Sequence, residues 1–328
     1  MSNILTYKIN MSSTGRLTQL PDSQRLFGAL IYLYAEHYSS EQATALVSKI
    51  RDGHMYFALS NMLPSDYLPV PQTYVLDQLA AYPNSKQIYQ AVKKRSFARR
   101  EQIDELLSNP VQADRIYPYA FIQSSQQIHA AIDSVRNDMP GLDPNVYSVP
   151  EVTVMEILQD GGKHQVVTVF SFYIATDECA ESTELLNALQ WATESKRRFF
   201  LGARASQGLN TYVVNGIQSE PWSIIEHSRD HLNLGMLLPD TIDFNQSSLN
   251  LFTSRRRPYD SSGGWKKGLA DKFISYIDAG SIVYLPNGRK CAGRSIPSPF
   301  NRQRDIVFGN AVLLPIRPVR RSKHEGTS

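Results

Sequence analysis

The sequence predicts an α+β fold, because short segments that alternate like β-strands occur between segments with the period of amphipathic helices. Its 328 residues exceed one minimal domain and suit two domains of ordinary size. With 42% hydrophobic and 20% charged residues, the composition is that of a globular protein rather than a disordered one. We therefore expect two folded domains that each combine strands with helices.

The first part of the chain is expected to begin with a strand followed by helices. Pro21-Asp22-Ser23 is a helix start signal, with Asp22 or Ser23 as the N-cap, and the apolar residues after it recur on one helical face. The expected elements are a strand at 5–11, helices at 23–37 and 40–51, a strand at 55–59 and a short helix at 101–109.

The rest of the pattern again places a helix between strands. The expected elements are strands at 116–123, 146–158 and 166–175, a helix at 182–195, and strands at 210–214, 232–238, 249–254, 273–277, 281–285 and 311–315. The repeated order strand, helix, strand is that of a ferredoxin-like (RRM-like) unit. We therefore predict two ferredoxin-like domains with long insertions, one at 1–215 and a basic one at 216–328.

The chain lacks the residue patterns of a zinc site, a disulfide scaffold or a membrane protein. Its two cysteines, Cys179 and Cys291, are far apart and form no CxxC pair, which favours a cytoplasmic location and no metal or cofactor. The N-terminus shows no basic region followed by an apolar run, so no secretory signal is expected. The most apolar stretch, LFGALIYLYA, is half the length of a membrane span and predicts a buried helix.

Positive charge is concentrated near the end of the chain. The protein carries a net charge of +3, yet the segment 255–323 holds fifteen Lys or Arg against four Asp, a local charge of about +11. Aromatic residues such as Trp265 and Phe273 are interleaved with these charges, which favours binding of a polyanion such as nucleic acid. The alternative is a solvated basic surface without a partner.

A glycine-punctuated loop, LGARASQGLN at 201–210, is the most informative local feature. Gly202 and Gly208 flank Arg204 and Ser206, and the basic KRR at 196–198 precedes them. Glycines let a backbone approach a phosphate closely, successive N–H groups can hold it, and arginine supplies charge. The loop is neither a P-loop nor a dinucleotide fingerprint, because no GK[ST] follows and it leads from a helix into a strand. An ordinary helix-to-strand turn is the alternative.

The loop belongs to a set of motifs in a fixed order. Before it come YKINMSSTGRLTQLPDSQRLFGAL at 7–30, LPVP at 68–71, KKRSFARREQIDELL at 93–107 and IHAAIDSVRNDMPGLDPNVYSVPEV at 128–152, and after it DAGSIVYL at 278–285 and FGNAVLLPI at 308–316. The ordered set resembles the RAMP superfamily of CRISPR proteins, which carry a glycine-rich loop between the last helix and last strand of a ferredoxin-like unit. Most closely, it resembles the family of fourth Csm subunits.

This resemblance implies a non-catalytic RNA-binding subunit at the foot of a type III-A CRISPR effector complex, which defends against foreign nucleic acid. Such a subunit holds the 5′ repeat-derived tag of the CRISPR RNA (crRNA). It also joins the large polymerase-domain subunit to the backbone RAMP subunit, the third Csm subunit. The residues expected to contact RNA are Arg25, Lys93, Lys94, Arg95, His129, Arg136, Gly202, Arg204, Ser206 and Gly208.

The middle block, 129–150, is expected to form an exposed excursion, a hairpin thumb that inserts between tag nucleotides. Pro140, Gly141 and Pro144 make this block unsuited to a buried element. An ordinary surface loop is the alternative. Single-stranded RNA also requires stacking partners, and Phe27 or Tyr147 could supply one, although both also fit core positions.

The competing hypothesis is a CRISPR RNA-processing endoribonuclease of the same superfamily, with His129 or His54 as general acid or base. Those enzymes end soon after the glycine-rich loop, whereas this chain continues to residue 328. His227 and His231 have i,i+4 spacing, but without an HExxH motif or nearby cysteines a structural role is favoured over metal binding. The sequence therefore favours a binding subunit over an enzyme.

Overall fold

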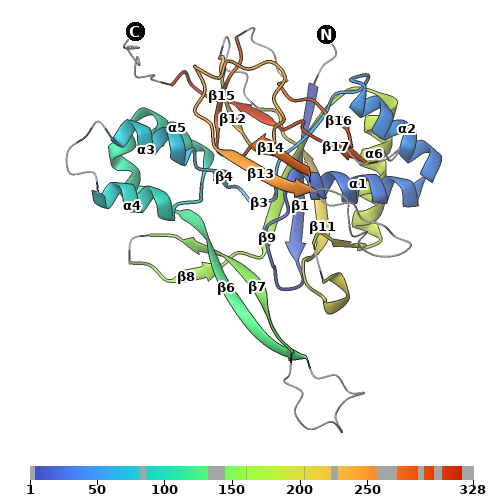
Figure 1. Ribbon diagram of the computed structural model, residues 1–328, viewed down its shortest axis with the longest axis horizontal. Coiled ribbons are helices and arrows are strands. Elements are labelled where there is room, and N and C mark those ends of the chain that lie inside the picture. Colours follow the sequence, from blue (N-terminus) through green and yellow to red (C-terminus); the bar gives the residue numbers. More distant parts are fainter. Residues whose placement is uncertain are drawn as a thin grey trace.

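The computed structural model describes residues 4–80, 82, 86–131, 145–159, 161–202, 204–222, 228–256, 272–286, 292–298 and 305–319. These residues form an α+β fold with antiparallel sheets (Figure 1). The helices and longer strands of the first part are β1 (Ile4–Ser13), α1 (Ser23–His37), α2 (Ser40–Arg51), β2 (Phe57–Leu59), α3 (Gln72–Leu79), α4 (Lys86–Lys94), α5 (Arg100–Ser108), β6 (Tyr119–Ala131), β7 (Asn145–Ile157), β8 (His164–Val166), β9 (Val169–Asp177), α6 (Ala180–Glu194), β10 (Arg198–Phe200) and β11 (Thr211–Ser219). The two-residue strands among them are β3 (Leu63–Pro64), β4 (Leu68–Pro69) and β5 (Phe97–Ala98).

The central sheet has the strand order β10-β11-β1-β9-β2, and its strand pairs are antiparallel. Helix α1 connects β1 toward β2, and α6 connects β9 toward β10 and β11. The chain order β1, α1, β2, β9, α6, β11 is that of a ferredoxin-like unit. The expected antiparallel α+β architecture is therefore confirmed, and the glycine-rich loop lies between edge strand β10 and β11.

Helix α1 covers the predicted range, Ser23 to His37. Its start is fixed by Asp22, whose side chain accepts a hydrogen bond from the Arg25 backbone N–H at 2.9 Å. Its apolar side packs into the core through Leu26, Phe27, Leu30, Ile31, Leu33 and Tyr34. The opposite side, which carries Arg25, Gly28 and Tyr32, is exposed. The helix thus has one face left for binding.

A long insertion between β3 and β9 contains two features. Helices α3, α4 and α5 form one lobe, at the left of Figure 1. The strands β4-β5-β6-β7-β8 form a second antiparallel sheet, in which β6 and β7 pair without a register shift from Tyr119–Ile157 to Ala131–Asn145. Figure 1 shows this hairpin projecting well away from the body. The expected excursion in the middle block is therefore a hairpin, although its tip, 132–144, lies outside the described residues.

The described part of the C-terminal region contains strands but no α-helix. These are β12 (Asp230–Asn233), β13 (Leu251–Arg256), β14 (Lys272–Ile277), β15 (Ile282–Tyr284), β16 (Ile296–Pro297), β17 (Ile306–Val307) and β18 (Leu313–Pro315). They pair as β15-β12-β18, β13-β14 and β16-β17. The expected second ferredoxin-like unit is not confirmed in these residues.

The C-terminal strands pack directly on the first sheet. Phe308 is fully buried and stacks on Phe27 of α1, with ring centroids 4.3 Å apart. The Leu59 backbone N–H of β2 donates to the Asn310 carbonyl, and the Leu59 carbonyl accepts from the Val312 N–H. Gly235 also packs closely here, since a Cβ on it would lie 2.3 Å from the Leu59 carbonyl oxygen. The predicted boundary at 215 falls inside β11, and one buried cluster combines residues from both sides of it.

We expect the Phe27–Phe308 contact to couple the two parts of the chain. Replacing Phe308 by Ala should lower the free energy of unfolding by about 3–5 kcal/mol, because it empties a fully packed aromatic position. Denaturant unfolding followed by circular dichroism measures this change. The exposed Phe244 provides the matched control, since Phe244→Ala should change stability by less than about 0.5 kcal/mol. Equal stabilities for the two variants would contradict the coupling.

Candidate nucleic-acid interface

The glycine-rich loop is a compact turn at the end of β10. It contains a short 3₁₀ turn, Ala205–Gln207, and three residues with left-handed backbone, Arg204 (φ 63°), Gly208 (φ 76°) and Asn210 (φ 54°). Ser206, Gln207 and Gly208 are exposed at its tip, and the Arg204 side chain approaches the amide oxygen of Gln207 at 3.4 Å. The tip therefore presents a hydroxyl, an amide and backbone to solvent.

Asn210 fixes this loop to the turn after β1. The residue is completely buried. Its side-chain oxygen accepts from the Thr18 backbone N–H, its amide nitrogen donates to the Thr18 hydroxyl, and its backbone N–H donates to the Arg16 carbonyl, each at 2.8 Å. Its own carbonyl accepts from the Leu201 backbone N–H at 2.9 Å. One residue thus ties together both ends of the loop and residues 16–18.

At two positions glycine is required because neighbouring atoms leave no room for a Cβ, and not because of a positive φ. A Cβ at Gly15 would lie 2.0 Å from the Gly208 carbonyl oxygen, and a Cβ at Gly202 would lie 2.6 Å from the Asn210 amide nitrogen. Real side chains do not reach such distances, so neither position accepts another residue without movement. Gly208 differs, because a Cβ there meets open space and only its positive φ favours glycine.

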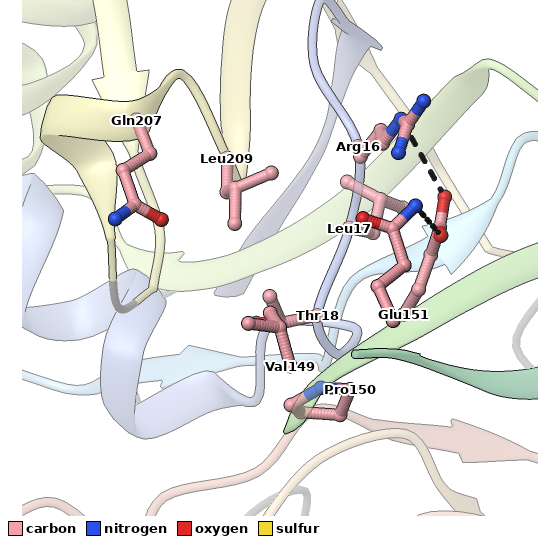
Figure 2. Close-up of a pocket in the computed structure, with 9 residues that line it drawn as sticks. Arg16, Leu17, Thr18, Val149, Pro150, Glu151, Gln207 and Leu209 are labelled. Atoms are coloured by element: carbon pink, nitrogen blue, oxygen red, sulfur yellow. Dashed lines mark hydrogen bonds and ion pairs between the residues drawn. The ribbon is translucent and has the colours of Figure 1, made fainter. Parts of the chain in front are cut away.

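The turn at residues 16–18 is also bonded to the β6–β7 hairpin. The Val152 backbone N–H of β7 donates to the Leu17 carbonyl at 2.7 Å, and the Arg16 Nε lies 3.7 Å from Glu151 Oε1. Gln127 of β6 donates from its amide to Glu151 at 2.8 Å. Figure 2 shows Arg16 and Glu151 together on one side of a pocket and Gln207 and Leu209 on the other, and Gln127 also lines this pocket. Loop, turn and hairpin therefore meet at one place.

This meeting point encloses a pocket of about 300 Å³ (Figure 2). Its lining consists of Arg16, Leu17, Thr18, Gln127, Val149, Pro150, Glu151, Gln207 and Leu209. Amide, carboxylate, hydroxyl and guanidinium groups thus surround an apolar floor. A second, larger groove of about 700 Å³ lies between α1 and β10, and its lining includes two residues of the predicted site, Arg25 and Gly202.

The fold is similar to that of a group of solved structures. No protein-family model and no curated protein sequence matches the chain. Csm4 in a Csm3–Csm4 subcomplex of the type III-A CRISPR-Cas interference complex is similar with a TM-score of 0.56 and 15% identity, over 96% of this chain and 100% of that one. Csm4 in a Csm1–Csm4 cassette with cA4 gives 0.54 and 12%, over 97% and 100%. The chain has the Csm4 fold.

Within this Csm4 fold, the basic run at 93–100 does not join the glycine-rich loop. Lys93 and Lys94 end helix α4, at the left of Figure 1, whereas β11 lies to the right of the hairpin. The Lys94 ammonium lies 5.4 Å from the centre of the Phe121 ring of β6, whereas the Lys93 ammonium lies 4.6 Å from the centre of the Tyr89 ring of α4. Within the motif at 93–107, the only strand is the two-residue β5, Phe97–Ala98.

Arg95 corrects the prediction more sharply. Its side chain is only 3% exposed, and its guanidinium donates to the carbonyls of Ala91, Asp114 and Ile116. The guanidinium also lies 4.2 Å from the centre of the Tyr119 ring. These contacts join Arg95 to helix α4, to residues 114–116 and to Tyr119 of β6. Arg95 is therefore a structural residue, and no RNA phosphate can reach it in this conformation.

The remaining predicted residues have mixed positions. His129 lies near the end of β6, paired with Tyr147 of β7, and Arg136 lies outside the described residues. Phe27 is buried against Phe308 and cannot stack on a base. Ten of the fifteen basic residues of the segment 255–323 also lie outside the described residues.

His231 is buried in β12, and burial lowers the pKa of its imidazole; His227 lies outside the described residues. Within the described ranges, no group of three or more His, Cys, Asp or Glu side chains could hold a metal ion. No helix in those ranges has both the length and the apolar character needed to cross a bilayer.

We predict that the three glycines of this interface differ in their tolerance of Ala. Gly15→Ala and Gly202→Ala should each lower the unfolding free energy and weaken RNA binding, because the added Cβ displaces the loop. Gly208→Ala should cost only about 1 kcal/mol, the price of its left-handed φ. Thermal unfolding of the three variants tests this order. A Gly208→Ala variant that is the most damaged of the three would contradict the Asn210-centred geometry.

Proposed function

We propose that this chain is a non-catalytic, RNA-binding subunit of a type III-A CRISPR effector complex that holds the 5′ repeat-derived tag of crRNA. The observation that carries the proposal is the exposed glycine-rich loop, held rigid by Asn210 between two open grooves. Arg16 lines one groove and Arg25 the other, so positive charge flanks the loop on both sides. The Csm4 fold supports the same assignment.

The loop tip is suited to a phosphate of the RNA backbone. Gly208 leaves the space above its Cα open, Ser206 offers a hydroxyl donor, and Arg204 offers a charged donor. Contacts of this kind position a strand without reading its bases. The polar pocket at the hairpin base adds groups that can contact a nucleotide next to that phosphate, namely Gln127, Glu151 and Gln207.

The hairpin is suited to act as a thumb between nucleotides. It leaves the body at the pocket that adjoins the loop, so an RNA held there meets its base. Ile128, near the end of the described part of β6, is 78% exposed. An exposed apolar side chain on a projecting arm can separate stacked bases, as apolar wedges do in other nucleic-acid complexes.

A role between two other subunits requires protein-binding surface elsewhere. The β13–β14 ribbon presents Leu251, Phe252 and Phe273, and all three are exposed. Leu251 and Phe273 lie on the same face of the ribbon, and exposed apolar side chains that share a face are typical of protein–protein interfaces. In the solved structures named above, Csm4 occurs with Csm1 and with Csm3. We propose that this chain likewise links the large polymerase-domain subunit to the third Csm subunit.

The salt dependence of RNA binding tests the phosphate contact. Arg204→Ala should reduce the slope of log affinity against log salt by roughly 0.7, the value of one phosphate contact on a single strand, and should weaken all tag sequences alike. Fluorescence anisotropy at several salt concentrations measures this slope. Arg51, which pairs with Asp52, is the matched control, and Arg51→Ala should leave the slope unchanged. Equal slopes for Arg204→Ala and the unmodified protein would assign the loop a purely structural role.

We predict that no histidine of this chain carries out RNA cleavage. A complex that contains His129→Ala should process and cleave RNA at the rate of the unmodified complex, because this subunit is proposed to bind RNA without cleaving it. A second complex with His54→Ala covers the exposed histidine after α2. Denaturing gels of radiolabelled crRNA precursor and target provide the readout. Loss of cleavage by an intact complex with either substitution would favour the endoribonuclease hypothesis instead.

A further inference from the structure

The 700 Å³ groove between α1 and β10 has a helix wall and a strand wall. Residues Arg25, Gly28, Ala29, Tyr32 and Glu36 line it from α1, and their spacing of three and four places them on one stripe of the helix. The opposite wall is edge strand β10 with its flanking residues, from Arg197 to Gly202. Since Leu201 and Gly202 begin the glycine-rich loop, the groove is continuous with the proposed phosphate site.

Two aromatic side chains are exposed in this groove. Tyr32 is 67% exposed on α1, and Phe200 is 53% exposed on β10. Large aromatic side chains contribute most to stability when buried, and these two line the groove while both are exposed. Neither ring belongs to the hydrophobic core, which on these two elements already contains Phe27 of α1 and Phe199 of β10.

Arginines surround the two rings. The Arg197 guanidinium lies 5.9 Å from the centre of the Tyr32 ring and forms an ion pair with Glu36. Arg25 and Arg198 also line the groove, and both are exposed. Because the single carboxylate is paired with Arg197, the groove carries a net positive charge. Exposed aromatic rings among arginines are the combination that binds single-stranded nucleic acid.

The floor of the groove leaves room for a flat group beside Tyr32. A Cβ placed on Gly28 would have no neighbouring atom within 4 Å, and Ala29 beside it is small. A helix interior does not need glycine, which lowers helix stability by about 1 kcal/mol relative to alanine. The open space above Gly28, one turn of α1 from Tyr32, can hold a planar base.

We propose that this groove is a second single-stranded RNA site, in which bases stack on Tyr32 and Phe200 while Arg25 and Arg198 contact phosphates. The proposal rests on the proposed function, since the RNA held at the glycine-rich loop continues into the groove past Gly202. Stacking tolerates any base, so the site binds RNA without selecting its sequence. The groove thereby lengthens the RNA segment that the subunit holds.

Three substitutions in the full-length chain test the site. Tyr32→Ala and Phe200→Ala should each weaken binding of a fluorescein-labelled oligoadenylate roughly five- to hundredfold, the loss that one stacked base accounts for. Gly28→Leu should weaken it as well, because the new side chain occupies the groove without meeting protein atoms. Tyr89→Ala and Phe244→Ala remove exposed aromatics elsewhere and should bind RNA like the unmodified protein.

A second probe, oligoadenylate with one 2-aminopurine, reports stacking directly. The fluorescence of 2-aminopurine should be quenched when the oligonucleotide binds the unmodified chain. This quenching should be lost in the variant that carries both Tyr32→Ala and Phe200→Ala. Arg204→Ala, measured alongside, separates the two proposals. If Arg204→Ala binds weakly while the three groove variants bind normally, the loop holds RNA and the groove does not. If the groove variants are weak while Arg204→Ala is normal, the groove proposal stands and the loop proposal fails.

The other class of occupant gives a different result. If Gly28→Leu releases a protein subunit from the assembled complex while the RNA affinity of the chain and the 2-aminopurine quenching are unchanged, a protein segment fills the groove. That outcome would overturn the RNA assignment. Circular dichroism of each variant confirms that α1 is intact, and Gly28→Leu is expected to be at least as stable as the unmodified chain.

Discussion

The buried amide of Asn210 is the interaction on which the candidate site depends. It holds a left-handed backbone conformation, closes the glycine-rich loop and bonds to Thr18 in the turn after β1. That turn in turn bonds to Val152 of the hairpin. Loop, turn and hairpin come from three distant parts of the chain, and this chain of hydrogen bonds sets their relative positions. A buried amide that lost its partners would cost about 1–3 kcal/mol per unsatisfied group, so the arrangement is strongly favoured.

The central sheet supports the place where the glycine-rich loop, the turn at residues 16–18 and the hairpin meet, and it leaves two sides of that place exposed. The central sheet fixes β1 and β11 side by side, so the turn after β1 and the loop before β11 necessarily meet. The C-terminal strands pack against β2 and α1, at the other end of the sheet from β10. The β10 edge therefore has no strand neighbour on its outer side in the described part of the chain, and α1 keeps one face open. RNA-binding groups can gather there without disturbing the core.

The sequence predicted the parts of this structure that depend on local pattern. The range of α1 followed from its cap at Asp22 and its apolar face, and the excursion at 129–150 from Pro140, Gly141 and Pro144, which are unsuited to a buried element. Helices α3 and α4 were missed because they are short, and α4 buries only Val92, so its stability depends on tertiary packing. Arg95 was misassigned because a basic run does not distinguish a buried arginine from exposed ones. The Asn210–Thr18 contact spans 192 residues, so no local signal could have revealed it.

The position of bound RNA on the protein tests the central claim most directly. Photo-crosslinking of 4-thiouridine crRNA in the assembled complex, followed by mass spectrometry, identifies the peptides that the RNA touches. We predict crosslinks at residues 16–18 and 198–209, on the two sides of the Asn210 junction, with further crosslinks at 25–32. Crosslinks confined to the basic segment after residue 255, with none at these positions, would contradict the account.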